Sequence, residues 1–167
     1  DYIYLQTAME LPYHEGFEDM TTFNGQDEWL VLNPDGNASF HITTSATYSG
    51  VKAVRLSNYN QDPGDIDELV SGPINLSVLN PSSDIVTLSF RYAYVRKSAT
   101  DDDFLRISVR GGCEDNWIVR KTLHGSLLSP IIVGSSWTPS SAAEWTTVHI
   151  TNITSSFFTG DFRMKFG

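Results

Sequence analysis

Between residues 85 and 95, large apolar side chains alternate with small or polar ones. Thr87, Ser89 and Arg91 lie between the apolar positions, which are Val86, Leu88, Phe90, Tyr92 and Tyr94. A period of two places all the apolar side chains on one face of an extended chain, whereas an amphipathic helix needs a period of 3.6. The pattern therefore predicts a long β-strand with one buried face.

The same alternation recurs along the rest of the chain. It predicts strands at residues 105–110, 117–120 and 162–166, and in the second of these segments it places Trp117 and Val119 on the apolar face. Shorter apolar runs predict further strands, at residues 29–32, 39–43, 51–57, 69–70 with 74–76, and 145–150.

Turn-forming residues separate these segments. Clusters of Asn, Pro, Asp and Gly, such as residues 33–36 and 61–65, bound most of them, and no long window keeps a helical period without a breaker. Many short strands with closely spaced turns predict an all-β chain, folded as an antiparallel β-sandwich or jelly roll. With 167 residues, the chain has the length of one such domain, 1–167. The Ser-rich stretch 127–143 is too polar for a core strand, so we expect a long connection there, either covering a sheet face or forming a binding loop.

Charge restricts the classes of partner. Twenty acidic and 11 basic residues give a formal net charge of −9, which argues against binding nucleic acid by bulk electrostatics. Charged residues make up 19% of the chain, less than the roughly 25% of an average soluble domain. Ser and Thr fill much of the polar surface instead, which fits an exported sandwich.

Signals for catalysis are weak. The segment from His14 to Glu18 has glutamate where a zinc-protease helix needs its second histidine, and Cys113 has no cysteine to pair with in this chain. A glycan hydrolase or lyase needs only two carboxylates, which sequence spacing cannot reveal. Acidic pairs occur at residues 18–19, 27–28, 67–68 and 114–115, all beside predicted turns. We therefore expect no enzyme activity, and keep a two-carboxylate hydrolase or lyase as the alternative.

Acidic residues at strand ends suit calcium, which collects six to eight oxygen ligands from carboxylates and loop carbonyls. The two groups that best fit such a structural Ca²⁺ site are Glu18 with Asp19, and Asp65 with Asp67 and Glu68. The competing interpretation is that each is a solvated loop charge.

Four tryptophans are candidates for stacking on a sugar ring. Trp29, Trp117 and Trp145 lie in strand patterns, so we expect them in the core. Trp137 lies in the Ser-rich stretch and is the predicted ligand-binding residue. The competing interpretation is that Trp137 fastens that stretch to a sheet.

Several blocks of the sequence resemble one known family. The residues from Leu11 to Asp19 are similar to its opening "LPF-x-E-x-FE", and the later blocks come in the family's order. These blocks are residues 29–36, 67–77, 88–94 and 103–117. Together they resemble the MAM-like jelly-roll modules attached to secreted bacterial metallopeptidases of the cytophagalysin type and to related cell-surface proteins.

The resemblance implies a concanavalin-like β-sandwich that is secreted or displayed at the cell surface. It implies a non-catalytic accessory module that binds protein or carbohydrate, often with a structural calcium ion held in part by the glutamate at position 18. Its expected partners are a neighbouring domain of a larger parent protein, an extracellular protein or a glycan, with no nucleic acid and no membrane span. The family's closing strand has no counterpart after Phe166, so we expect the chain to be a fragment of that parent. A purely structural spacer remains a further alternative.

Overall fold

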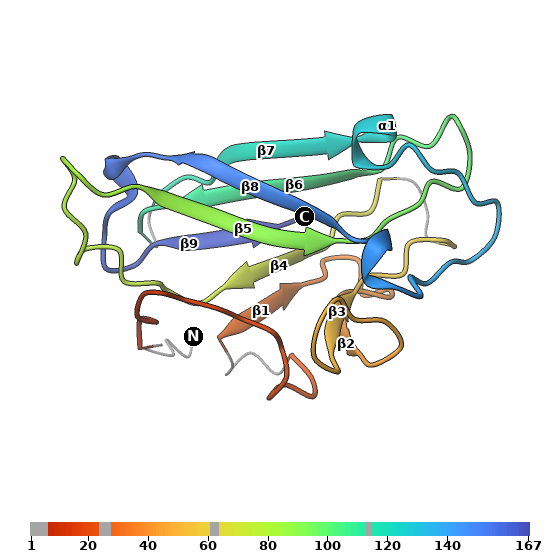
Figure 1. The fold of residues 1–167 in the computed structure, drawn as a ribbon, viewed down its shortest axis with the longest axis horizontal. Helices are drawn as coiled ribbons and strands as arrows, with labels where there is room; N and C mark the ends of the chain where they lie inside the picture. Colours follow the sequence, from red (N-terminus) through yellow and green to blue (C-terminus); the bar gives the residue numbers. More distant parts are fainter. Residues whose placement is uncertain (1–6, 24–27, 61–63, 113–114) are drawn as a thin grey trace.

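The structure is a computed structural model that describes residues 7–23, 28–60, 64–112 and 115–167. It is an antiparallel β-sandwich, as the alternating pattern predicts (Figure 1). The larger layer is a five-stranded sheet in the order β1-β4-β9-β6-β7. Its strands are β1 (Trp29–Leu32), β4 (Glu68–Ser71), β9 (Arg163–Phe166), β6 (Phe104–Arg110) and β7 (Ile118–His124).

The second layer is narrower. It is formed by β5 (Val86–Tyr92) and β8 (Thr146–Ile153), which cross in front of the larger sheet in Figure 1. The small hairpin of β2 (His41–Thr43) and β3 (Ala53–Arg55) lies at one end of the sandwich. All nine strands fall on segments that the sequence predicts, whereas residues 74–76 form no strand and Ile74 makes only isolated bridges.

The helices of the described chain are single turns: α1 (Gly125–Leu128) and the 3-10 turns η1 (Ala142–Glu144) and η2 (Ser155–Phe157). None of them is long and apolar enough to span a membrane.

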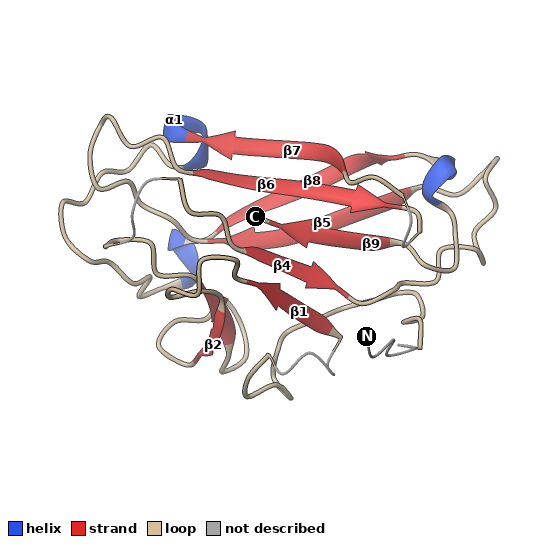
Figure 2. Ribbon diagram, turned by 180° about the vertical axis from the view of Figure 1, so that it is seen from behind, coloured by secondary structure: helices blue, strands red, loops and turns tan. Residues whose placement is uncertain are grey.

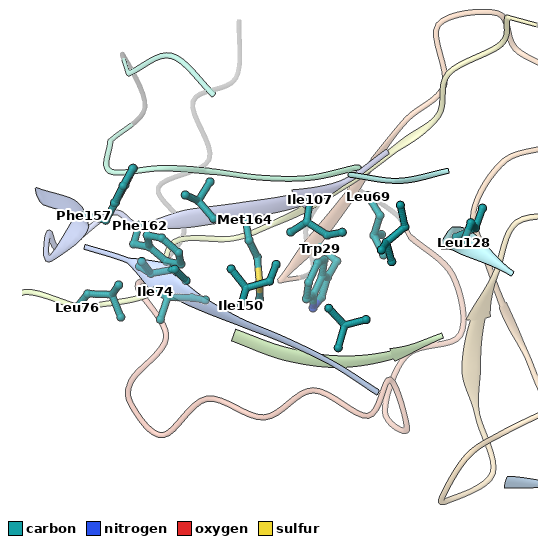
Figure 3. Packing of buried hydrophobic residues seen from close by; sticks show 14 residues of the cluster. Trp29, Leu69, Ile74, Leu76, Ile107, Leu128, Ile150, Phe157, Phe162 and Met164 are labelled. Atoms are coloured by element: carbon teal, nitrogen blue, oxygen red, sulfur yellow. The ribbon is translucent and has the colours of Figure 1, made fainter. Parts of the chain in front are cut away.

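The hydrophobic core fills the space between the two layers (Figure 3). Ile107 and Val109 of β6 are completely buried, and Trp29 of β1 is 3% exposed. Met164 of β9 and Ile150 of β8 face each other across the sandwich. These inward positions are the apolar half of each alternating pattern, since burying them removes their surface from water. Partly buried side chains of the N-terminal segment, among them Met9 and Phe17, pack against the same core.

The long connection 127–143 is fastened to the sandwich by a buried arginine. Arg96, 9% exposed, donates from Nε to the carbonyl of Ser129 at 2.8 Å and from Nη1 to the carbonyl of Ala99 at 3.1 Å. The backbone N–H of Arg96 donates a hydrogen bond to the carbonyl of Ile131, and its carbonyl accepts one from the N–H of Val133. The first part of this connection is therefore held against the segment that follows β5, and both interpretations, a cover and a binding loop, stay predictions.

Candidate functional site

The outer face of the five-stranded sheet is not covered by another layer (Figure 2). Because side chains alternate along a strand, the residues between the core positions of β1, β4, β9, β6 and β7 share this face. Strand register gives one transverse row across all five strands: Leu30, Val70, Lys165, Ser108 and Val119. We call this surface the outer face.

Basic residues are concentrated on the five-stranded sheet, and acidic residues are nearly absent from its strands. Its strands contain six of the 11 basic residues but only one of the 20 acidic residues, Glu68. The sheet therefore has a net charge of +5 in a chain of net charge −9. The basic residues lie on three neighbouring strands: Arg106, Arg110, Arg120, Lys121, Arg163 and Lys165. Register places Arg110 directly opposite Arg163.

Trp117, directly before the edge strand β7, stacks with two cations of the outer face. The guanidinium of Arg110 lies 4.6 Å from the centroid of its ring, and the ammonium of Lys165 lies 4.9 Å from it. Such distances allow cation–π attraction. Ser108, in the row between these cations, is only 2% exposed although it lies on the outer face. The surrounding side chains therefore close over the sheet at this point.

The prediction that Trp117 and Val119 point inward is wrong, for a local geometric reason. The β6–β7 ladder contains a register shift between Ile107 and Ser108, so the alternation of β7 changes face within the strand. Val119 pairs with Ser108 on the outer face and is 50% exposed, whereas Leu123 pairs with Leu105 and is buried.

Next to Trp117 lies a shallow depression lined mainly by polar side chains. Glu68 forms an ion pair with Lys165. Arg106 lies 4.6 Å above the ring of Phe104, is exposed, and has no acidic partner among the residues that the structure describes. Arg106 is therefore a cation of the outer face that an incoming anion can reach without breaking an ion pair with a described residue.

Apolar side chains border the basic centre. Five large ones near it are more than a third exposed: Leu30, Leu32, Ile66, Phe104 and Val119. The outer face thus combines a cationic and aromatic centre with an apolar margin.

The acidic residues predicted for calcium lie in separate places. Both carboxylate oxygens of Glu18 accept from the backbone N–H of Val51, at 3.1 and 3.3 Å, and Oε1 also accepts from the N–H of Lys52 at 3.2 Å. The Lys52 side chain in turn donates to the carbonyls of Glu18 and Met20. Glu18 therefore joins the N-terminal segment to the loop between β2 and β3.

The second predicted group is dispersed as well. Asp67 accepts from the hydroxyl of Ser39, and Asp65 accepts from the side-chain amide of Asn37 at 2.8 Å. Glu68, next to Asp67, instead forms its ion pair with Lys165.

These carboxylates do not fit a single calcium ion. Glu18, Asp67 and Glu68 each face a different hydrogen-bond or ion-pair donor, and Asp19 lies on the exposed surface. Within the described ranges, no three His, Cys, Asp or Glu side chains gather closely enough to hold a metal ion. Calcium binding by this protein stays a prediction, without a site assembled from these five residues.

Trp137 is half-buried within the long connection and belongs to none of the strands. Of the three tryptophans expected in the core, only Trp29 belongs to it. Trp145 is half-buried and forms an edge-to-face pair with the exposed Tyr48, with ring centroids 6.4 Å apart. A sugar-stacking role for Trp137 stays a prediction.

One pair of carboxylates does converge, and sequence spacing did not indicate it. The hydroxyl of Tyr13 lies 3.2 Å from Oε2 of Glu28 and 3.4 Å from Oε2 of Glu15. The same hydroxyl accepts a hydrogen bond from Nε1 of Trp29 at 3.1 Å. Burial, followed by the two nearby carboxylates, raises the pKa of Tyr13 above its ordinary value even though the Trp29 hydrogen bond lowers it. Cys113 and two members of the acidic pairs, Asp27 and Glu114, lie outside the described residues.

The chain was also compared with known proteins. No family model matches it, and no curated protein is similar to it.

Proposed function

We propose that this chain is a non-catalytic binding module of a secreted or cell-surface protein. The observation that carries the proposal is the outer face of the uncovered five-stranded sheet, where Arg106, Arg110, Arg163 and Lys165 share one side with a single acidic strand residue, Glu68, in a chain of net charge −9. A surface whose charge opposes that of the rest of the molecule attracts oppositely charged partners and orients their encounter.

The composition of the outer face also favours binding. Aromatic residues and arginine are enriched at recognition surfaces, and acidic residues are depleted there. On the outer face, Phe104 stacks with Arg106 at one end of β6 and Trp117 stacks with Arg110 at the other, and the five strands that form the sheet contribute one acidic residue. A sheet that served only as a spacer would have no need of this separation.

The parent protein is a second part of the proposal. The blocks that resemble MAM-like modules support a jelly-roll accessory domain attached to a metallopeptidase, with the neighbouring domain as one partner. Determining what the same reading frame encodes before Asp1 and after Gly167 tests this part. A peptidase domain in frame supports it, and a frame with no peptidase domain overturns it.

The binding function is tested with the folded chain and a panel of polysaccharides and immobilised extracellular proteins. Binding to at least one of them, without release of reducing sugar or peptide fragments, is the expected result. A folded sample that binds nothing overturns the proposal, and so does turnover of any of them.

A second candidate function rests on the convergence of Glu15 and Glu28 at Tyr13. Because both carboxylates contact one hydroxyl, their Oε2 atoms lie at most 6.6 Å apart, a limit that includes the spacing of about 5–5.5 Å used by retaining glycosidases. A glycan hydrolase or lyase would lose activity in Glu28→Gln, and Glu10→Gln is a matched control on the same segment as Glu15. If the wild-type chain cleaves none of the polysaccharides in the panel, this candidate is excluded.

A further inference from the structure

We propose that the outer face binds an anionic polysaccharide, a polymer of sugar rings that carry carboxylate or sulfate groups, with Trp117 and Arg106 as its principal contacts. This inference rests on the proposed binding function and names the ligand class and the surface. Trp137, the tryptophan expected from the sequence, is not part of this site.

Electrostatics selects an anion. Arg106 and Arg110 of β6 and Arg163 and Lys165 of β9 share the outer face, where Lys165 forms an ion pair with Glu68 and Arg163 forms one with Asp161. The remainder of the chain is acidic, so an anion is repelled elsewhere and attracted here. Arg106 is exposed and has no acidic partner in the described residues, so its guanidinium can donate two hydrogen bonds to one carboxylate or sulfate.

The indole of Trp117 supplies the apolar contact. A sugar ring presents C–H groups on its flat side, and an aromatic ring is a flat apolar surface of matching size. Arg110 and Lys165 lie over the half-buried Trp117 ring, 4.6 and 4.9 Å from its centroid, and hold it in position, so little side-chain entropy remains to be lost when a ligand contacts the exposed part of the indole.

The shape of the outer face favours a polysaccharide over a protein. Protein interfaces depend on a few side chains that enter well-packed pockets. The outer face offers a shallow depression bordered by Glu68, Arg106 and Lys165, with Trp117 beside it. An extended chain of flat rings can lie across such a surface without entering a pocket.

Charge density favours a polysaccharide over nucleic acid. Duplex DNA carries about one negative charge per 1.7 Å. Such a dense anion would be repelled strongly by the acidic remainder of a chain with net charge −9. A polymer with one carboxylate or sulfate on each sugar ring has a lower charge density, so it can satisfy the cations of the outer face with less repulsion.

The test measures binding by titration calorimetry and affinity electrophoresis at low salt. Polygalacturonate is the carboxylate probe, heparin the sulfate probe, dextran the neutral probe, and oligo-dT the nucleic-acid probe. The key variants are Arg106→Gln and Trp117→Ala. Arg91→Gln is the matched control, because Arg91 is also exposed and also stacks on an aromatic ring, that of Tyr48 at 4.0 Å, but lies outside the five-stranded sheet.

We expect polygalacturonate or heparin to bind and dextran not to bind. Arg106→Gln should weaken binding about tenfold, as for loss of a charge-assisted hydrogen bond, and Trp117→Ala about tenfold or more, as for loss of a stacking contact. Arg91→Gln should change binding less than twofold, and so should Trp137→Ala. If Trp117→Ala unfolds the chain, Arg106→Gln decides the question.

Other results overturn the inference in distinguishable ways. Binding only to dextran or to a protein contradicts the anionic ligand but leaves the proposed binding function intact. Tighter binding to oligo-dT than to either anionic polysaccharide would show that the ligand is a nucleic acid. An equal loss of affinity in Arg106→Gln and Arg91→Gln would show that binding depends on the net charge of the protein and not on the outer face. If the folded chain binds none of the probes and none of the proteins, the inference and the proposed function fail together.

Discussion

The carboxylate of Glu18 accepts hydrogen bonds from the backbone N–H of Val51, 33 residues further along the chain. The contact joins an irregular N-terminal segment to the loop before β3. It also gives this glutamate a structural function that requires no metal ion, because the donors are backbone amides.

Replacing this carboxylate should therefore destabilise the protein whether or not calcium is present. For Glu18→Gln we expect a loss of about 1–2 kcal/mol in the free energy of unfolding, the range for hydrogen bonds to a charged group near the surface. Urea unfolding in EDTA and in calcium should give equal losses. A loss of stability that occurs only in calcium would instead indicate that Glu18 is a metal ligand. Glu10→Gln is the control.

Gly50 lies directly against the same carboxylate. Its φ of +69° is in the left-handed region, and a Cβ added there would clash with Oε1 of Glu18. Gly50→Ala should therefore cost about 1 kcal/mol or more in the free energy of unfolding. Gly36→Ala is the matched control, since Gly36 has a φ of +74° but open space around it. Equal losses in both variants would show that backbone strain alone is responsible.

Arg96 should determine whether the long connection stays attached. Arg96→Met removes the buried donors to Ser129 and Ala99 and leaves their carbonyls unpaired. We expect a loss of about 2–3 kcal/mol and faster proteolytic cleavage within residues 127–143. Arg91→Met, an exposed change, should alter neither measurement. Unchanged cleavage in Arg96→Met would mean that other contacts hold the connection.

The core prediction compares two isoleucines on adjacent strands. Ile107 of β6 is fully buried, whereas Ile118 of β7 is 44% exposed. Ile107→Ala should cost about 2–5 kcal/mol, because it leaves a cavity, and Ile118→Ala should cost clearly less. Chemical denaturation measures both. Similar losses would contradict the assignment of Ile107 to the centre of the core.

Alkaline pH should destabilise the fold through two tyrosines. Burial is the first cause that raises the pKa of Tyr13 and of Tyr94, and nearby acidic groups add to it, among them Asp103, which accepts the Tyr94 hydroxyl at 2.5 Å. The unfolded chain releases these protons near pH 10, before the folded chain does. Stability is therefore complete below pH 10 and falls as the pH rises above it.

Tyrosinate absorbance and the denaturation midpoint, followed from pH 8 to 12, measure this loss. Tyr94→Phe should make the decline less steep, whereas Tyr48→Phe, at an exposed ring, should leave it unchanged. An identical decline in wild type and Tyr94→Phe would assign it to other groups.

The inward side chains of most strands could be predicted from the sequence. Leu105, Ile107 and Val109 were expected on the core face and lie there, and so do Phe162 and Met164. Alternation is a property of consecutive residues, so it is visible without knowledge of the fold. It fails in β7, where a register shift between strands changes the face of Trp117 and Val119. No local pattern marks that shift.

The candidate site could not be predicted from local sequence patterns, because strand pairing brings its residues together from distant parts of the chain. The calcium prediction grouped acidic residues by their positions near strand ends, but neighbours on a strand face opposite sides, so Asp67 and Glu68 meet different partners. The outer face could not be predicted, because Arg106 and Lys165 are 59 positions apart in the sequence and become neighbours only when β9 pairs with β6.

The sequence by itself determined the fold class, the strands and most of the buried residues, since a period of two and turn residues are local properties of the chain. The tertiary structure alone decided which strands are neighbours and which side chains share a face. The order β1-β4-β9-β6-β7 arises from hydrogen bonds between distant segments, and it brings Arg110 of β6 and Lys165 of β9 to the ring of Trp117. Pairing of this kind minimises the free energy of the whole chain, so no segment of the sequence encodes it alone.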